Sequence, residues 1–570
     1  MKKVSIQINK KKIVADEGRS ILDIARENKI EIPSLCFHPD LEAKAGCRLC
    51  LIEIKGKNRL LTACSIKAEQ GMEILTSSPK IERARKINLE LIFAQHREEC
   101  DDCIWKDKCR LLNLAKKYKL NLNRFEDRKK KFPWYQFGPS VVFDSSKCMD
   151  CRNCVEACHK QGADFLELRE QDSFFEVFPT KDPKKDCIYC GQCLTHCPVG
   201  AFEAVGEYED IEKPFQDKDK TIVVQFAPAI RTSIGEEFNM KPGEVVTDKL
   251  VAAIKKLGAD KVFDVSVGAD FTTMEEAKEL LEKIKKGKGV CLSSCCPAWV
   301  KFLEFKYPEF IPHIATTRSP HIILGALIKT YWAKNQGIDP RKIKVISIMP
   351  CTAKKYEVIR DELEVFGMEP VDYVLTTREL ARLLKKRNID LKKVKPEPAD
   401  NPLGAPSGAG VIYGASGGVA ESALRTAYYL LTGKNLKNVD LKDVRGMEGI
   451  KKAEINMEGF KARIAVVTGT GNAEKILKEL KKNPKAYNAL EVMACPGGCI
   501  GGGGQPLPST PEIRKQRAEA LYKIDARKKL RLAHENPILK KVYKEFLKDE
   551  KTIHRICHTS YKKKTREVKI

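Results

Sequence analysis

Two cysteine runs between residues 148 and 198 share the same spacing. The first reads Cys148-x2-Cys151-x2-Cys154-x3-Cys158, and the second reads Cys187-x2-Cys190-x2-Cys193-x3-Cys197-Pro198. In paired runs of this kind, each run gives three thiolates to one 4Fe-4S cluster and its fourth thiolate to the other cluster. The expected ligands are Cys148, Cys151, Cys154 and Cys197 for one cluster, and Cys187, Cys190, Cys193 and Cys158 for the second.

Four more cysteines lie near the N-terminus, in loops between strand-like segments and one amphipathic helix expected at 21–27. They follow the pattern Cys36-x10-Cys47-x2-Cys50-x13-Cys64. Four thiolates in a compact, β-rich module suit a 2Fe-2S cluster. Because the spacing differs from the plant-type C-x4-C-x2-C, a zinc site is the alternative.

A third group contains one imidazole and three thiolates. His96, Cys100, Cys103 and Cys109 lie within 14 residues, after a helix expected at 81–95. Four such donors complete a tetrahedral site, and the spacing alone fits zinc as well as an iron-sulfur cluster. A histidine in place of a thiolate would change the charge of a cluster and hence its reduction potential.

Other paired cysteines lie in the second half of the chain, near apolar segments. Beyond about residue 210, buried strands are expected at 222–226, 262–265, 345–348, 410–413 and 464–467, with amphipathic helices between them. This alternation is typical of parallel α/β sheets, whose sites form at the carboxyl ends of strands. The cysteine-bearing segments there are Ser294-Cys295-Cys296-Pro297, Met349-Pro350-Cys351 and Met493-Ala494-Cys495-x3-Cys499. We expect these loops to converge on one site.

Length and composition restrict the class of protein. The 570 residues are enough for about three to five domains, and the 42% hydrophobic and 32% charged residues are typical of a soluble folded chain. No apolar stretch approaches the ~20 residues of a membrane span, and no export signal is visible. Clustered thiols also need a reducing setting, so we expect a cytoplasmic protein with no membrane insertion. The net charge of +26 has no aromatic interleaving or DNA-binding motif beside it, which favours a solvated basic surface or an acidic electron carrier over nucleic acid.

Together these motifs resemble the iron-only (FeFe) hydrogenases, of the monomeric type with several accessory clusters. The resemblance is carried by Ser294-Cys295-Cys296-Pro297-x-Trp299, Met349-Pro350-Cys351-x2-Lys354-x2-Glu357 and Met493-Ala494-Cys495-x3-Cys499, and the order of the modules matches as well. It implies a multidomain α/β protein with α+β N-terminal modules. The implied domains are a β-grasp 2Fe-2S ferredoxin-like domain at 1–78, a small helical one-His three-Cys 4Fe-4S module at 79–125, a bacterial ferredoxin-like domain with two 4Fe-4S clusters at 126–209, and a two-lobed α/β catalytic domain with parallel sheets at 210–570, basic and helical from about 510.

The same resemblance implies the cofactors and the reaction. The reaction would be the reversible reduction of protons to H2 at an H-cluster, which is a 4Fe-4S cubane linked to a diiron subsite with CO, CN and azadithiolate ligands. Cys296, Cys351, Cys495 and Cys499 would hold the cubane, and Cys499 would also bridge to the diiron subsite. Electrons would pass through one 2Fe-2S cluster and three accessory 4Fe-4S clusters, the His96 site among them.

Proton transfer and the surroundings of the diiron subsite are implied in the same way. Cys295 matches the family's proton-transfer thiol. Glu276 and Glu279 lie three apart on a helix expected at 274–285 and are relay candidates, although glutamates on a charged helix ordinarily face solvent. Lys354 would hydrogen-bond a cyanide ligand. Pro228, Met349, Met493 and Gln505 would surround the subsite, for which core packing is the alternative.

Some positions depart from the family pattern. Ala315 stands where a serine hydroxyl usually lies between the two glutamates, so Thr316 or water would have to replace it. Ser293 replaces the usual threonine, Ala298 the usual glycine and His321 the more common glutamine. These changes bear on the rate and the proton route and leave the ligand set intact.

The resemblance further implies ferredoxin or flavodoxin as the electron carrier and separate hydrogenase maturation proteins that build the diiron subsite. One alternative is a non-catalytic H2 sensor or an iron-sulfur assembly protein related to hydrogenases. Such relatives typically lose the proton-transfer cysteine or residues around the subsite, whereas Cys295 and Lys354 are present. Another alternative, the large subunit of a respiratory NADH dehydrogenase, leaves the three C-terminal motifs unexplained.

Overall fold

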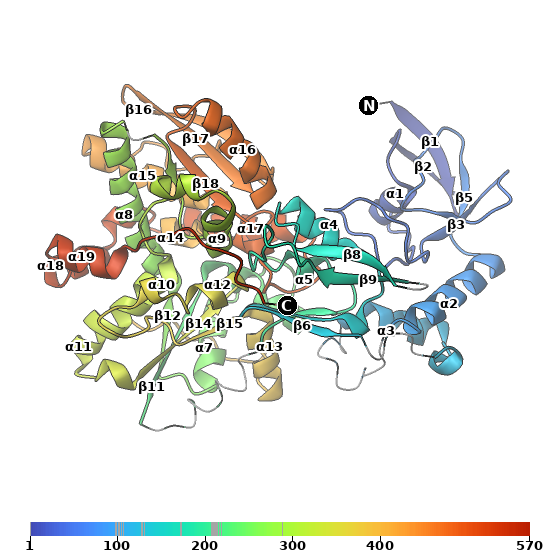
Figure 1. The fold of residues 1–570 in the computed structure, drawn as a ribbon, viewed down its shortest axis with the longest axis horizontal. Coiled ribbons are helices and arrows are strands. Elements are labelled where there is room, and N and C mark those ends of the chain that lie inside the picture. Colours follow the sequence, from blue (N-terminus) through green and yellow to red (C-terminus); the bar gives the residue numbers. More distant parts are fainter. Residues whose placement is uncertain are drawn as a thin grey trace.

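The computed structural model describes residues 2–96, 100, 103, 105, 108–126, 129, 132–171, 174–206, 212, 215, 217, 219–287 and 289–569. The N-terminal module and the large C-terminal domain lie at opposite ends (Figure 1). Between them lies the ferredoxin-like region, which contains α4 (Asn153–Lys160), α5 (Gln192–His196), β8 (Leu166–Gln171) and β9 (Phe174–Pro179). The domain boundary expected at 209/210 lies outside the described residues. Among the described residues, no helix combines the length and the apolar character needed to cross a membrane.

The first module is a mixed sheet with one helix packed against it. Its strands lie in the order β2-β1-β5-β3-β4, and β1 pairs with β5 in parallel. The bounds are β1 Lys3–Ile8, β2 Lys11–Asp16, β3 Leu51–Ile54, β4 Leu61–Thr62, β5 Glu73–Leu75 and α1 Ile21–Glu27. Alternate side chains of β1 are buried, and Ser20 caps α1 by accepting from the backbone N–H of Asp23, so the predicted helix is confirmed.

Two helices connect this module to the rest of the chain. They are α2 (Pro79–Phe93) and α3 (Arg110–Tyr118). Arg85 of α2 is buried and donates to the carbonyls of Leu49 and Leu51, at 2.9 and 2.8 Å. These charge-assisted hydrogen bonds fix α2 beside the loop that carries Cys47 and Cys50.

The ferredoxin-like region contains one sheet, one β-hairpin and two short helices. The bounds are β6 Trp134–Phe137, β7 Val141–Asp144, β10 Phe202–Ala204, β8 Leu166–Gln171, β9 Phe174–Pro179, α4 Asn153–Lys160 and α5 Gln192–His196. Each cysteine run enters its helix through a residue with left-handed backbone, Arg152 in one and Gly191 in the other. A Cβ at Gly191 would lie 2.5 Å from Thr352 Oγ1, so this second turn requires glycine to pack on the C-terminal domain.

The C-terminal domain is built around two sheets. One has the order β12-β11-β14-β15 with all pairs parallel, and the other has the order β13-β18-β17-β16, in which only β16 runs antiparallel. The strands are β11 Thr221–Phe226, β12 Lys261–Asp264, β13 Cys291–Leu292, β14 Ile343–Met349, β15 Tyr373–Thr376, β16 Ile450–Met457, β17 Phe460–Thr468 and β18 Ala489–Met493. The predicted parallel α/β architecture is confirmed.

Helices cover both sheets. They are α7 Thr247–Lys256, α8 Val265–Lys285, α9 Pro297–Lys306, α10 Pro320–Leu327, α11 Ala333–Gln336, α12 Ala353–Glu357, α13 Thr377–Lys386, α14 Gly408–Ile412, α15 Gly418–Thr432 and α16 Thr470–Lys482. The strand expected at 410–413 is wrong, because this segment forms α14 and its first residues are capped by Ser407. Its side chains are buried on all sides, and a short apolar run does not distinguish a buried helix from a buried strand.

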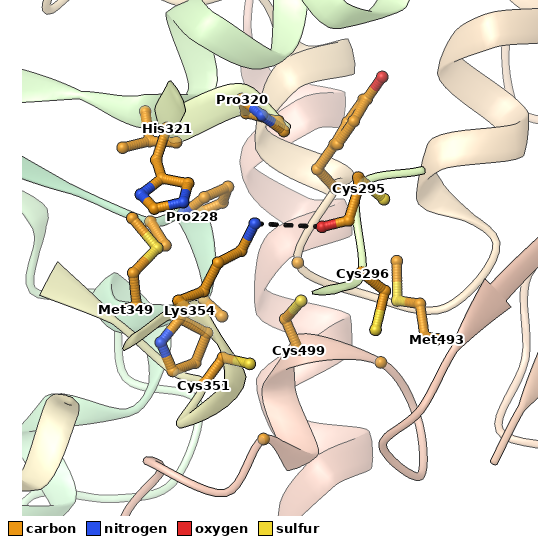
Figure 2. Close-up of a pocket in the computed structure, with 18 of the residues that line it drawn as sticks. Pro228, Cys295, Cys296, Pro320, His321, Met349, Cys351, Lys354, Met493 and Cys499 are labelled. Carbon is orange, nitrogen blue, oxygen red and sulfur yellow. Dashed lines mark hydrogen bonds between the residues drawn. The ribbon is translucent and has the colours of Figure 1, made fainter. Parts of the chain in front are cut away.

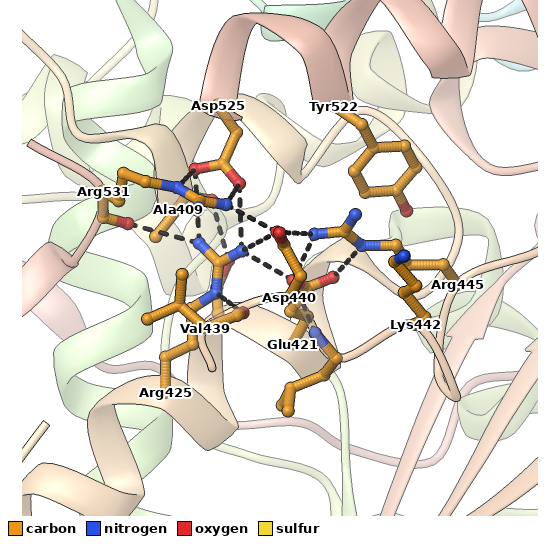
Figure 3. A network of polar contacts seen from close by, with 12 residues as sticks. Ala409, Glu421, Arg425, Val439, Asp440, Lys442, Arg445, Tyr522, Asp525 and Arg531 are labelled. Atoms are coloured by element: carbon orange, nitrogen blue, oxygen red, sulfur yellow. Dashed lines mark hydrogen bonds and ion pairs between the residues drawn. The ribbon is translucent and has the colours of Figure 1, made fainter. Parts of the chain in front are cut away.

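The C-terminal region, expected to be helical, contains α17 (Pro511–Arg527), α18 (Pro537–Glu545) and α19 (Glu550–Cys557) and then an extended tail. Asp525 of α17 binds Arg425 of α15 and Arg531, and Glu421 binds Arg425 and Arg445 (Figure 3). Breaking one pair would leave a buried charge uncompensated, so this network fixes α17 on α15.

The tail returns from the C-terminal domain to the ferredoxin-like region. Arg566 donates to the carbonyls of Thr180 and Asp182, at 2.6 and 2.8 Å. The backbone N–H of Glu567 donates to Asp186, whose carboxylate also pairs at 2.9 Å with the buried Lys301 of α9. The last residues therefore connect the ferredoxin-like region to the C-terminal domain.

Candidate functional site

Five cysteines converge on one buried cavity between the two sheets of the C-terminal domain. Its lining comes from the loops after β11, β13, β14 and β18, as expected for the carboxyl ends of strands. The cysteines are Cys295, Cys296, Cys351, Cys495 and Cys499, and Pro228, Met349, Lys354 and Met493 line the same space. Figure 2 shows the labelled thiols of Cys296, Cys351 and Cys499 pointing toward a common centre. Gln505 does not line the cavity but supports the loop that carries Cys499: its side-chain amide donates to the carbonyl of Cys499 at 3.3 Å.

The residues present fit an iron-sulfur cofactor. Cys351, Cys495 and Cys499 line one buried cavity, where burial raises the pKa values of their thiols and the neighbouring cysteine thiols raise them further. Soft thiolates in such a site select iron-sulfur clusters over hard cations. The backbone at Gly502 packs directly against the loop that carries Cys351. A Cβ on Gly502 would lie 2.1 Å from the carbonyl oxygen of Pro350, so this close approach requires glycine.

Lys354 is held at the cavity by a chain of polar contacts. Its Nζ donates to the carbonyl of Cys295 at 3.1 Å (Figure 2) and pairs with Glu357 at 2.7 Å. Burial opposes the charged form, but Glu357 keeps the pKa of Lys354 above its usual value. His321 Nε2 also binds Glu357, at 2.6 Å, and burial together with Lys354 lowers the pKa of His321 to about 4. A neutral imidazole thus supports a buried ammonium that faces the cavity.

Cys295 lines the cavity, and the buried Glu276 of α8 lies close enough to influence its protonation. Burial, followed by the influence of Glu276, raises the pKa of Cys295 well above its ordinary value, so the thiol keeps its proton. Burial also raises the pKa of Glu276 to about 8, and the nearby Glu279 and Glu491 add to the shift. Among the described residues, Glu276 Oε1 has no hydrogen-bond partner. This carboxyl is therefore poised to gain or lose a proton near neutral pH.

Glu279 lies one turn further along α8, on the same side as predicted, in a different environment. It accepts hydrogen bonds from Thr316 N at 2.8 Å, from Thr316 Oγ1 at 3.0 Å and from Thr317 Oγ1 at 2.7 Å. Although burial opposes it, His558 and Thr317 lower the pKa of Glu279 below its ordinary value. At neutral pH Glu276 is thus mostly protonated and Glu279 is ionised. Such a difference in pKa between two neighbouring carboxyls is typical of acid–base pairs.

Two groups beside Glu279, Thr317 and His558, are not indicated by any motif in the sequence. Thr317 is fully buried, and its carbonyl accepts from Ser294 Oγ at 2.6 Å, which places two hydroxyls beside the glutamates where Ala315 supplies none. His558 comes from the end of α19, 242 positions after Thr316, which it contacts. No local pattern could have indicated that contact.

Comparison with known proteins agrees with this geometry. Residues 220–503 match the family described as "Iron only hydrogenase large subunit, C-terminal domain", and residues 511–564 match "Iron hydrogenase small subunit". NADP-reducing hydrogenase subunit HndD of Solidesulfovibrio fructosivorans is 39% identical and covers 99% of this chain and 100% of its own. Iron hydrogenase 1 of Clostridium pasteurianum is 37% identical, and the match covers 98% of this chain and 100% of that protein.

The chain belongs to the iron-only hydrogenase family. It is therefore an oxidoreductase that acts on H2. The solved [FeFe]-hydrogenase structure of HydA(deltaEFG) matches with a TM-score of 0.57 and 36% identity, covering 63% of this chain and 99% of that one. Assembly relatives are more distant: cytosolic iron-sulfur assembly component 3 of Mus musculus is 28% identical over 72% of this chain. The C-terminal match also sets aside the NADH dehydrogenase alternative.

The accessory modules of this hydrogenase bind iron-sulfur clusters. Residues 1–79 match a "2Fe-2S iron-sulfur cluster binding domain" and residues 147–201 a "4Fe-4S dicluster domain", so zinc is set aside at the first module. The structure buries Cys36, Cys47, Cys50 and Cys64 together. Cys158, Cys187, Cys190 and Cys193 line one cavity, while Cys148, Cys151, Cys154 and Cys197 form the other group.

The one-His three-Cys group lies beside the ferredoxin-like region. His96 is buried, and its Nδ1 donates to the carbonyl of Lys147 at 2.8 Å. This bond fixes the ring orientation, as for many ligating histidines. Cys109 is buried at the start of α3, and Cys100 and Cys103 are half-buried.

Proposed function

We propose that this hydrogenase moves protons through Cys295, Glu276 and Glu279 and electrons through its accessory clusters while it interconverts protons and H2. The observation that carries the proposal is the convergence of five cysteines on a buried, largely apolar cavity with a protonatable carboxyl, Glu276, close to Cys295. A redox site that handles protons needs a dry centre and a separate path for each particle.

Four of the thiols would hold the cubane of the H-cluster: Cys296, Cys351, Cys495 and Cys499, with Cys499 shared with the diiron subsite. When bound, the H-cluster supplies redox-active iron and an open coordination position for H2 chemistry. Cys295 would exchange protons at its thiol, and Lys354 would donate a hydrogen bond to an anionic ligand of the subsite. Pro228, Met349 and Met493 would exclude water around it, and Gln505 would support the Cys499 loop.

The electron path would end at the cluster held by Cys158, Cys187, Cys190 and Cys193. Cys495 Sγ lies 3.8 Å from the carbonyl oxygen of Cys190, so this cluster would be the one beside the H-cluster. The contact is supported by Thr352 Oγ1, which donates to the carbonyl of Tyr189 at 2.7 Å. One further 4Fe-4S cluster in the ferredoxin-like region, one at His96, Cys100, Cys103 and Cys109, and the 2Fe-2S cluster would extend the path outward.

The external electron carrier would be ferredoxin or flavodoxin in a reducing, cytoplasmic setting. The net charge of +26 favours an acidic carrier. One relative is named an NADP-reducing hydrogenase subunit, so an NADP-linked path through further subunits is the second candidate. Reduced ferredoxin should be tested as electron donor to the isolated chain, and NADPH as donor to the enzyme purified with any associated subunits. H2 evolution from ferredoxin supports the first candidate, whereas evolution from NADPH but not from ferredoxin supports the second. Separate maturation proteins would supply the diiron subsite.

The proton route is tested by Cys295→Ala. We expect this variant to lose nearly all H2 evolution from reduced methyl viologen while its iron content stays at the wild-type level. Cys291→Ala is the matched control, because Cys291 is also buried but lies outside the cavity lining. Retained activity in Cys295→Ala would contradict the proton role of the thiol.

A further inference from the structure

The C-terminal region places an imidazole between two carboxylates of α8. His558 Nδ1 lies 3.2 Å from Glu279 Oε1, and His558 Nε2 lies 3.3 Å from Glu275 Oε2. His558 Nδ1 is also 2.9 Å from the hydroxyl of Thr316, which is exposed. The His558 side chain itself is 12% exposed. One ring nitrogen, Nδ1, therefore contacts both Glu279 and the hydroxyl of the solvent-exposed Thr316, while the other, Nε2, contacts Glu275.

Backbone pairing holds His558 in this place. Thr317 and His558 form an antiparallel bridge, and Thr559 N donates to the carbonyl of Thr316 at 2.8 Å. Arg318 adds two contacts, from its backbone N–H to the Cys557 carbonyl and from Nε to the His558 carbonyl, both at 2.6 Å. Residues 316–318, which follow Ala315, are therefore hydrogen-bonded to residues 557–559 at the end of α19.

Charged and titratable groups surround the ring on every packed element. Glu275 and Glu279 come from α8, Lys278 pairs with Glu275 at 2.8 Å, and Tyr543 of α18 donates to Glu275. Arg318 lies behind the backbone of His558, and His554 stacks on the ring with centroids 5.7 Å apart. Burial lowers the pKa of His558, but the two glutamates outweigh it and raise the pKa to about 9. The ring is a cation at neutral pH.

We propose that His558 exchanges protons between solvent and Glu279, at the outer end of the route, and so acts on catalysis through Glu279. The inference rests on the proposed proton route. In H2 evolution the Nδ1–H bond breaks as an O–H bond forms on Glu279 Oε1, directly or through the Thr316 hydroxyl. The imidazole, now neutral, is then protonated again by hydronium or a buffer acid from the solvent, and no electron moves. The reverse sequence operates in H2 oxidation.

The test compares two variants of His558, at the C-terminal end of α19, with one control variant within α19. His558→Gln keeps hydrogen-bonding groups but does not titrate, and His558→Arg keeps the positive charge but does not release its proton. Lys551→Gln, two turns earlier on α19 and exposed, is the control. We expect both His558 variants to lose at least about 10-fold in kcat at pH 7 with an unchanged KM for methyl viologen, and the control to match the wild type. The difference from wild type should narrow above pH 9, where the imidazole is neutral.

A second readout does not depend on turnover. Each of the nine histidines gives a Cε1 signal in oxidised, 13C-histidine-labelled protein, and the signal missing in either His558 variant identifies His558. We expect it to titrate near pH 9. Titration near the ordinary value of ~6.5 would overturn the pairing with Glu275 and Glu279.

The outcomes separate the inference from the function on which it rests. Wild-type rates in His558→Gln would overturn the inference. Wild-type rates in His558→Arg alone would overturn it too, because they would show that only the positive charge at this position is needed. If Cys295→Ala also retained activity, the proposed proton route itself would fail. If His558→Gln does not fold with its full iron content, the rate of His558→Arg and the histidine titration still test the inference.

Discussion

Glu276→Gln is the substitution whose effects follow most directly from the structure. Glutamine has nearly the same shape but carries no exchangeable acid proton, so the route from Cys295 toward Glu279 is interrupted. Loss of a positioned acid–base group typically lowers a rate by 10²–10⁴-fold, and we expect about a 100-fold loss of H2 evolution with unchanged iron content. Glu276→Asp, which keeps the acid but shortens it, should retain more activity than Glu276→Gln.

The same substitution has a pH-dependent effect on stability. In the unfolded chain this carboxyl has a pKa near 4.5, whereas burial raises it to about 8 in the folded protein. The folded state therefore binds more protons between these values, and wild-type stability falls as the pH rises from about 4.5 to 8. At about 1.4 kcal/mol per pH unit, the loss reaches on the order of 5 kcal/mol at most. Glu276→Gln removes it.

Paired thermal unfolding measurements at pH 5, 6.5 and 8 test this reasoning. The Tm of Glu276→Gln relative to wild type should rise steadily with pH, while its H2 evolution stays low throughout. Parallel Tm profiles for the two proteins would refute the assignment of a buried, protonated carboxyl at Glu276. Activity within twofold of wild type would refute its place in the route.

The other predictions concern the neighbours of this route. Ala315→Ser adds a hydroxyl where the family usually has one, so H2 evolution should be unchanged or faster; a large loss of rate would show that this position does not lie beside the route. Lys354→Met leaves the buried Glu357 without its ammonium partner, so unfolding should become easier by about 3–5 kcal/mol and the diiron subsite should no longer be retained. The exposed Lys285→Met is its control, and an unchanged Tm with a full diiron content in Lys354→Met would contradict the role given to Lys354.

Much of the site could be predicted because cysteine spacing is a local property. The paired runs at 148–197 and the loops after β13, β14 and β18 bring thiols together once the strands are parallel. Consecutive residues such as Val223 and Val224 point to opposite faces of their sheet and are both buried, which gives the sequence its apolar runs. Helix 21–27 was equally predictable, since Ser20 supplies a cap at its start.

The parts that could not be predicted depend on tertiary contacts. Residues 408–412 are buried on all sides, so periodicity could not identify them as helix α14. The raised pKa of Glu276 depends on burial by elements distant in sequence, and base rates for glutamate on a charged helix favour a solvent-facing position. His558 approaches Glu279 only because α19 and the tail pack along residues 316–318.

The central claim is that the cavity holds a working H-cluster. The most direct test is anaerobic H2 evolution from reduced methyl viologen by protein with reconstituted clusters, measured with and without a supplied diiron subsite. The structure predicts rapid, sustained evolution only with the subsite present. Absence of H2 from protein that has the subsite and its full iron content would contradict the claim.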